Sequence, residues 1–292
     1  MLQIELYTEI TCPWCIIGHH RLDKVLAERF PELEVDIRQH PVLLLPDGPA
    51  EGLYIPDLLL KRYGVTDPKA SFARPEAEAR ASGLDLDLSR QPWTYRTQAA
   101  HGLILAAQAR GTQHQLAVAI THTHFLEAKN ISDPDVLADV AAAYGFEREE
   151  ARAIALDPEQ HRRVEQEAVR SMAAGVSSVP YFVFGRHIAI NGGRSEDEIA
   201  AAIREAADVN LSAQQSLRNF RSIVRHPHAS SNQHRLLGGD TRRRALRYCR
   251  GDGGHRWVCK IAGGVDAGHA GFATLIDLER DAEGRIDRGQ AQ

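Results

Sequence analysis

Two stretches near the start of the chain alternate apolar and polar residues, over residues 2–8 and residues 33–39. A period of two predicts β-strands with one buried face. Between them, apolar residues recur at helical spacing from Leu22 to Phe30, and Pro31 is expected to end that helix. The chain therefore opens as strand–helix–strand, which favours a parallel pair of strands joined by a right-handed crossover.

The next part of the chain has a helical pattern. Residues 41–52 are rich in Pro and Gly and predict a loop, after which apolar residues recur mostly at helical spacing as far as Gly175. The predicted helices are 53–63, 67–82, 97–110, 113–127, 133–143, 147–155 and 158–174.

Strand patterns return after this helical region. An apolar run at 179–184, a turn at 185–186 and a second run at 187–190 predict a hairpin. Ser195 and Glu198 have the spacing of a capping box, which predicts one more helix. Without the helical insertion, strand–helix–strand and strand–strand–helix remain, and together they predict a compact α+β sheet domain. An insertion is compatible with that sheet because chain ends that are close in space tolerate long excursions.

Cys12 and Cys15 lie at the junction between the first strand and the first helix, in the sequence Cys12-Pro13-Trp14-Cys15. Unpaired backbone N–H groups and the helix dipole at this position favour a thiolate. The spacing brings the second sulfur close enough to form a disulfide. We expect Cys12 to be the exposed, attacking sulfur and Cys15 the buried, resolving one. A zinc half-site or two inert thiols are the alternatives, and zinc would need a second ligand pair.

The sequence resembles the DsbA family of thioredoxin-fold proteins, and within it the FrnE-like branch. The motifs that carry the resemblance are residues 9–18 (EITCPWCIIG) and residues 175–183 (GVSSVPYFV), and the similarity extends over roughly residues 1–207. Three features depart from the usual pattern: Glu9 replaces an Asp, Ser178 replaces a Gly, and residues 191–194 (NGGR) replace Ser-Gly-Ala-Gln. The last difference is expected to alter the rim of the substrate groove.

This resemblance implies an α/β, thioredoxin-like fold with a large all-helical insertion. It also implies a cis Val179–Pro180 bond facing the cysteine pair, whereas the sequence alone shows only a proline at the start of a strand. An extended substrate would then pair with the Val179 backbone and place its disulfide over Cys12. Trp14 is expected to shield the disulfide. The expected catalytic residues are Cys12 and Cys15, and the expected substrate-binding residues are Pro13, Trp14, Val179 and Pro180.

Charge divides the chain near Asn210. Residues 1–210 carry 21 Lys and Arg against 31 Asp and Glu, whereas residues 211–292 carry 14 against 8 and hold 11 of the 23 glycines. We therefore expect a thioredoxin-like domain over 1–210, built from 1–40 and 176–208 around an insertion at about 53–175. Residues 211–292 are expected to be a disordered basic tail rich in Gly and Arg. Cys249 and Cys259 in this tail are interpreted as unpaired thiols, with a second disulfide or electron relay as the alternative.

Some candidate side chains remain ambiguous at this level. His19 and His20 follow the cysteine pair closely and are expected to be solvated. Glu9 is either a proton relay to Cys15, since a buried thiol needs a base nearby, or a solvated carboxylate. His122 and His124 are two residues apart and cannot share a helix face, which disfavours a metal pair.

Together these patterns predict a cytoplasmic thiol–disulfide oxidoreductase that exchanges disulfides with protein or small-thiol substrates. No bound cofactor or metal is expected, and glutathione is a candidate co-substrate. No apolar run is long enough for a membrane helix, no secretory signal is evident, and the net charge of −4 argues against nucleic-acid binding. The alternatives are a glutathione-dependent isomerase or transferase of the same superfamily, or a non-enzymatic interaction module. The substrate, the direction of exchange and the oligomeric state are left open.

Overall fold

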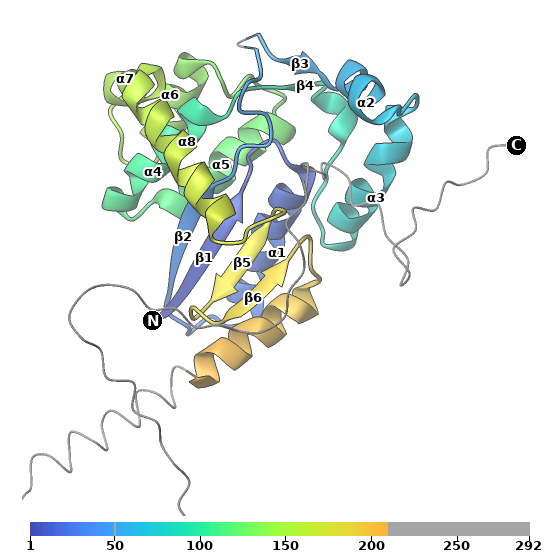
Figure 1. The fold of residues 1–292 in the computed structure, drawn as a ribbon. Helices are drawn as coiled ribbons and strands as arrows, with labels where there is room; N and C mark the ends of the chain where they lie inside the picture. The colour runs from blue at the N-terminus through green and yellow to red at the C-terminus, as the bar shows by residue number, and fades with distance from the viewer. Residues whose placement is uncertain (50, 210–292) are drawn as a thin grey trace, which may run out of the picture. The chain divides into compact units, whose positions relative to one another are not determined.

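Strand β1 occupies an inner position of a four-stranded sheet. The structure is a computed structural model that describes residues 1–49 and 51–209. Within them β1 (Leu2–Thr8) pairs in parallel with β2 (Val35–Pro41) and antiparallel with β5 (Tyr181–Phe184), which pairs antiparallel with β6 (Ile188–Asn191). The sheet order is β2-β1-β5-β6, so the two ends of the described sequence meet at β1 (Figure 1).

One face of this sheet is covered by two helices, α1 (Pro13–Arg29) and a helix over 196–209. The alternating residues of β1 supply the apolar side of this interface, and Phe182 and Phe184 extend it along β5. Ile199 and Ile203 pack into the same core from the last helix. Burial of these side chains is the main term that holds the helices on the sheet.

The insertion between β2 and β5 is helical. It contains α2 (Ile55–Tyr63), α3 (Pro68–Ala81), α4 (Gln98–Ala107), α5 (Gln113–Phe125), α6 (Pro134–Ala142), α7 (Arg148–Leu156) and α8 (Pro158–Ala173). Short 3₁₀ turns lie at Leu88–Arg90 and Gln108–Arg110, and β3 (Leu53–Tyr54) pairs with β4 (Trp93–Thr94). Helices α4, α5 and α8 contact β2, whereas α2 and α3 form a separate group beside the start of α1 (Figure 1).

The expected α/β architecture with its helical insertion is confirmed, and the differences from the sequence prediction are local. Residues 53–54 form a strand rather than the first turn of α2, because Pro56 fits the first turn of a helix that begins at Ile55. Strand β2 lies two residues later than predicted and ends at Pro41, where a missing N–H costs no internal ladder bond. The predicted capping box is present: Glu198 N donates to Ser195 Oγ, and Ser195 N donates to the Glu198 carboxylate.

The predictions for the tail, including those for Cys249 and Cys259, concern residues outside the described part of the chain. Within that part, no helix combines the length and the apolar character that a membrane span requires.

Candidate active site

The cysteine pair lies at the start of α1. Cys12 is the N-cap residue, Pro13 is the first residue of the helix, and the Cys15 N–H donates to the Cys12 carbonyl at 2.9 Å. Both thiols are free. Proline at this position has no N–H to leave unpaired, so the local sequence favours a helix that begins immediately after Cys12.

Cys12 is buried, and the prediction that it is exposed was wrong. Only 1% of the residue is accessible, compared with 0% for Cys15, which was correctly predicted to be buried. Both cysteines belong to an apolar cluster with Val42, Val176 and Val179. These residues come from the loop after β2 and from the segment before β5, which are far from Cys12 in sequence. The position in the helix, rather than the exposure, therefore distinguishes the two sulfurs.

The surroundings of Cys15 favour its protonated form. Burial raises the pKa of the Cys15 thiol well above its ordinary value, and the neighbouring Cys12 sulfur raises it further. A hydrogen bond from the Glu9 backbone opposes this effect only in part. Cys15 is therefore a thiol at neutral pH and must lose a proton before it can act as a nucleophile.

The segment before β5 lies directly beside the Cys12 sulfur. The thiol of Cys12 donates to the Val179 carbonyl over 3.9 Å, and the Val179–Pro180 bond is cis, as the resemblance implied. Pro180 in turn rests on α1 at Gly18, where an added Cβ would lie 3.0 Å from Pro180 Cγ and 3.1 Å from Phe182 Cζ. The absence of a side chain at Gly18 lets the proline approach the active-site helix.

Glu9 lies in the interior next to the cysteine pair and is not a solvated carboxylate. It is 1% exposed and accepts hydrogen bonds from Leu44 N at 3.0 Å and from the Thr97 hydroxyl at 3.2 Å. His101 from α4 places its Nε2 3.7 Å from Glu9 Oε1, which is an ionic separation too long for a hydrogen bond. A buried acid and a buried imidazole therefore meet behind Cys15. His101 falls within the helix predicted over 97–110, and sequence reasoning assigned it no role.

His19 is also buried, contrary to the expectation that it is solvated. It is 2% exposed, its Nε2 lies 3.4 Å from the Gln39 amide nitrogen, and its ring packs edge-on to His114. Burial, together with the smaller effect of the facing His114, lowers the pKa of His19 to about 3. His19 is therefore neutral in the folded protein, and it belongs to the interface between α1 and the insertion. His20, by contrast, is partly exposed, and its Nε2 lies 2.9 Å from the Ser82 carbonyl.

Trp14 contacts two groups. Gly193, in the loop after β6, comes so close that an added Cβ would lie 2.9 Å from Trp14 Cζ3 and nearer still to Cε3. The Arg74 guanidinium lies 5.5 Å from the ring centroid, within the range of a cation–π contact. The indole therefore has a defined position beside Cys12 and Pro13.

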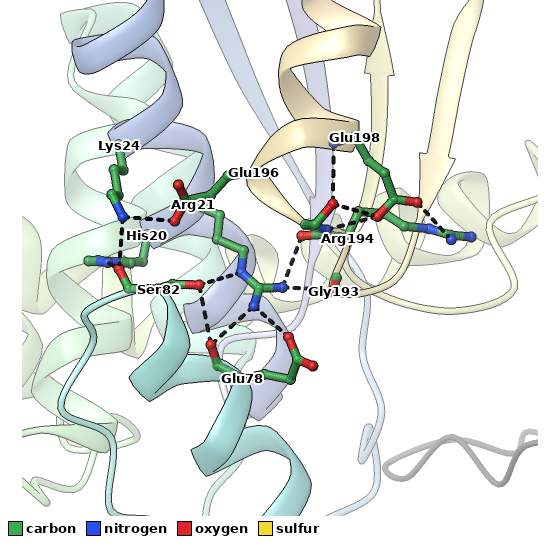
Figure 2. A network of polar contacts seen from close by, with 10 residues as sticks. His20, Arg21, Lys24, Glu78, Ser82, Gly193, Arg194, Glu196 and Glu198 are labelled. Carbon is green, nitrogen blue, oxygen red and sulfur yellow. Dashed lines mark hydrogen bonds and ion pairs between the residues drawn. The ribbon is translucent and has the colours of Figure 1, made fainter.

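A buried arginine fixes the loop that contacts Trp14. Figure 2 shows Arg21 of α1 donating to the carbonyls of Gly193 at 2.9 Å and Arg194 at 3.0 Å. The same guanidinium donates to Ser82 Oγ at 2.6 Å and to both the carbonyl and the carboxylate of Glu78. Arg21 thus connects the active-site helix, the end of α3 and the loop after β6. Sequence analysis missed this role because a single Arg on a helix is usually solvated.

The arrangement of side chains also bears on metal binding. Over residues 1–49 and 51–209 no group of three or more His, Cys, Asp or Glu side chains is arranged to hold a metal ion. The predicted residues Cys12, Pro13, Trp14, Cys15, Val179 and Pro180 do come together in one place. This site joins two buried thiols, an extended backbone segment beside them and an indole at its edge.

The fold and this site define a thioredoxin-fold protein with a helical insertion. The chain belongs to the family of DsbA-like thioredoxin domains, whose sequence model matches residues 3–204. No curated protein matches the sequence.

Several solved structures share the fold of this chain. A probable DsbA oxidoreductase from Streptomyces coelicolor is 25% identical, with a TM-score of 0.64 over 71% of this chain and 91% of that one. A 2-hydroxychromene-2-carboxylate isomerase is 17% identical, with a TM-score of 0.54 over 73% and 98%. The cytosolic disulfide reductase DsbM from Pseudomonas aeruginosa, in a structure with glutathione, is 15% identical, with a TM-score of 0.50 over 73% and 99%. The last two show a likeness of fold alone.

Proposed function

We propose that this protein is a thiol–disulfide oxidoreductase of the FrnE-like branch that exchanges disulfides with protein or small-thiol substrates. One observation carries the proposal: Cys12 caps α1 beside the Val179 carbonyl, and Cys15 lies one turn further into the helix. Cys12 is the sulfur at the helix start, and burial keeps Cys15 protonated until it is needed.

The exchange has two steps. The Cys12 thiolate attacks one sulfur of a substrate disulfide, which forms a mixed disulfide and releases the other substrate sulfur as a thiolate. Cys15 then gives up its proton and attacks the Cys12 sulfur, which releases the second substrate thiolate and closes the Cys12–Cys15 disulfide. The substrate gains two electrons and the cysteine pair loses them. Reoxidation of a substrate dithiol follows the same steps in reverse.

Two neighbours have roles in this scheme. Glu9 is the acceptor for the Cys15 proton, because its carboxylate is buried nearby and its charge is one of the causes that raise the Cys15 pKa. The Val179 backbone holds an extended substrate in line with Cys12, since the carbonyl already approaches that sulfur.

Glutathione is the proposed thiol that returns the oxidised pair to its reduced form, and the proposed compartment is the cytosol. The fold likeness to a cytosolic disulfide reductase solved with glutathione supports both assignments. An oxidised pair would regain its electrons from two glutathione molecules, which leave as glutathione disulfide.

The deciding experiment compares two assays on the purified full chain. We expect it to reduce insulin disulfides with glutathione as reductant, and to lose this activity in Cys12→Ser. Glutathione conjugation or isomerisation that survives in Cys12→Ser, without disulfide reduction in the wild type, would instead support the transferase or isomerase alternative. Inactivity in both assays would support a non-enzymatic thioredoxin-fold interaction module.

A further inference from the structure

A pocket opens beside Trp14. Thr11, Pro13 and Trp14 form one wall, and Leu58, Leu59 and Phe72 from α2 and α3 form much of the other. Thr11 and Pro13 immediately flank Cys12 in the sequence, and Trp14 follows Pro13. The pocket is therefore continuous with the proposed active site, although the insertion supplies most of its surface.

The size of the pocket suits one side chain. The cavity has a volume of about 70 Å³, whereas one water needs only about 10–15 Å³ on the same measure. The exposed surface of its lining is almost entirely apolar. An apolar group that enters it loses contact with water where it meets the lining, and this burial is the main source of affinity at such a site.

Arg74 supplies the charge at this pocket. It is exposed, its guanidinium stacks on Trp14, and it has no salt bridge among the residues that the structure describes. The other charged groups of α3 lie outside the pocket lining. The nearby Glu76 carboxylate accepts from the N–H of the lining residue Leu88 at 2.9 Å. A substrate that places a carboxylate near Arg74 would therefore meet a cation that has no ion pair in the described part of the chain.

We propose that this pocket is a substrate subsite for one apolar side chain, leucine or phenylalanine in size, next to the reactive cysteine of an extended peptide. A following acidic residue would lie against Arg74. This inference deepens the proposed disulfide exchange and rests on it, since the pocket selects among substrates by their side chains while Cys12 performs the chemistry.

The test uses a panel of short disulfide-linked peptides that differ only beside the cysteine. With the wild-type chain we expect kcat/KM to be at least about tenfold higher for Leu or Phe than for Gly at this position. A Glu after the apolar residue should add about two- to fivefold over Lys, and Arg74→Gln should remove that gain. Arg80→Gln, an exposed site on the same helix that does not line the pocket, should keep it.

A variant whose larger side chain fills the pocket provides a second test of the subsite. Ser71 lines the pocket, so Ser71→Phe should reduce turnover of the Leu peptide to the level of the Gly peptide. Ala70→Phe, one residue earlier on exposed surface, is the matched control and should leave the preference intact. Near-ultraviolet circular dichroism of both variants checks that they fold.

Binding measurements distinguish the proposed subsite from the proposed disulfide exchange. Peptides with Ser in place of Cys cannot react, so their dissociation constants by calorimetry report the subsite alone. Tighter binding of the Leu than of the Gly peptide, with no turnover of any disulfide, including 2-hydroxyethyl disulfide, would overturn the exchange but retain the subsite. Equal binding and equal turnover across the panel would overturn the subsite.

Discussion

Gly193 lies against the indole of Trp14, with no space between them for a β-carbon. The two residues are far apart in sequence, and Arg21 holds their contact by donating to the Gly193 and Arg194 carbonyls (Figure 2). The resemblance to FrnE-like proteins departs from its usual pattern in this same loop. The departure at residue 193 therefore has a structural consequence, because a side chain at this position would displace Trp14.

Replacing Gly193 with Ala should displace Trp14. We expect a loss of about 1–3 kcal/mol in the free energy of unfolding, as for other overpacked sites, and a change in the Trp14 fluorescence spectrum. Fluorescence is measured against Trp14→Phe to subtract the other two tryptophans. Gly192→Asn is the control, because residue 192 has a φ of 82°, which Asn tolerates, and no atom within 4 Å of its Cβ position. An unchanged Trp14 spectrum in Gly193→Ala would contradict the contact.

Replacing Arg21 with Lys should keep a positive charge but lose the fork of donors. The buried Ser82 hydroxyl and three partly buried carbonyls would then lack this partner, so we expect a loss of about 2–4 kcal/mol in the free energy of unfolding, measured with urea. Most of this effect comes from these acceptors, because the Glu78 carboxylate is half exposed. Arg29→Lys, on the exposed part of the same helix, should have little effect. Equal losses in both variants would mean that Arg21 does not clamp the loop.

The two cysteine variants should behave differently with a disulfide substrate. Cys15→Ser should accumulate a mixed disulfide through Cys12, because attack survives and resolution does not. Cys12→Ser should accumulate none, since Cys15 lies one turn into the helix and its raised pKa keeps it protonated. Non-reducing gel electrophoresis and mass spectrometry after acid quenching measure the adduct. Equal trapping by the two variants would reverse the assigned roles.

Acid should destabilise the protein through its buried histidines. Burial lowers the pKa values of His19 and His124 to about 3 in the folded state, while the unfolded chain titrates near 6.5. Below pH 6.5 the unfolded state therefore binds more protons, and stability falls towards pH 3 by up to about 1.4 kcal/mol per pH unit for each group. His19→Gln should reduce this slope between pH 6.5 and 5, as measured by urea unfolding. An unchanged slope would show that His19 is accessible to protons in the folded state.

Much of the fold could be predicted from the sequence because its elements are long and periodic. The helices from α2 to α8 lie within a few residues of their predicted bounds, since their apolar faces and terminal signals agree. Strands β3 and β4 were missed, because two residues are too few to show a period. Their pairing depends on Leu53 and Thr94 meeting across the insertion, which no local pattern records.

Only those parts of the site that lie in local sequence motifs could be predicted. Cys12, Cys15 and Pro180 were found because their motifs are local, whereas the burial of Cys12 depends on Val42, Val176 and Val179. The partners of Arg21 likewise come from two separate segments, so its role appears only when the chain has folded. The Trp14 pocket was missed for the same reason, since the apolar residues of α2 and α3 predict core equally well.

The order of strands in the sheet has a consequence for synthesis on the ribosome. Cys12 emerges 167 residues before Val179, the residue whose carbonyl it meets in the folded chain. At about 5–20 residues per second, that interval is roughly 10–30 s. During this interval the nascent chain carries both thiols without the Val179 segment that lies beside them, and β1 lacks its neighbour β5. The fold therefore cannot shield the two sulfurs of the emerging chain until the segment before β5 has been synthesised.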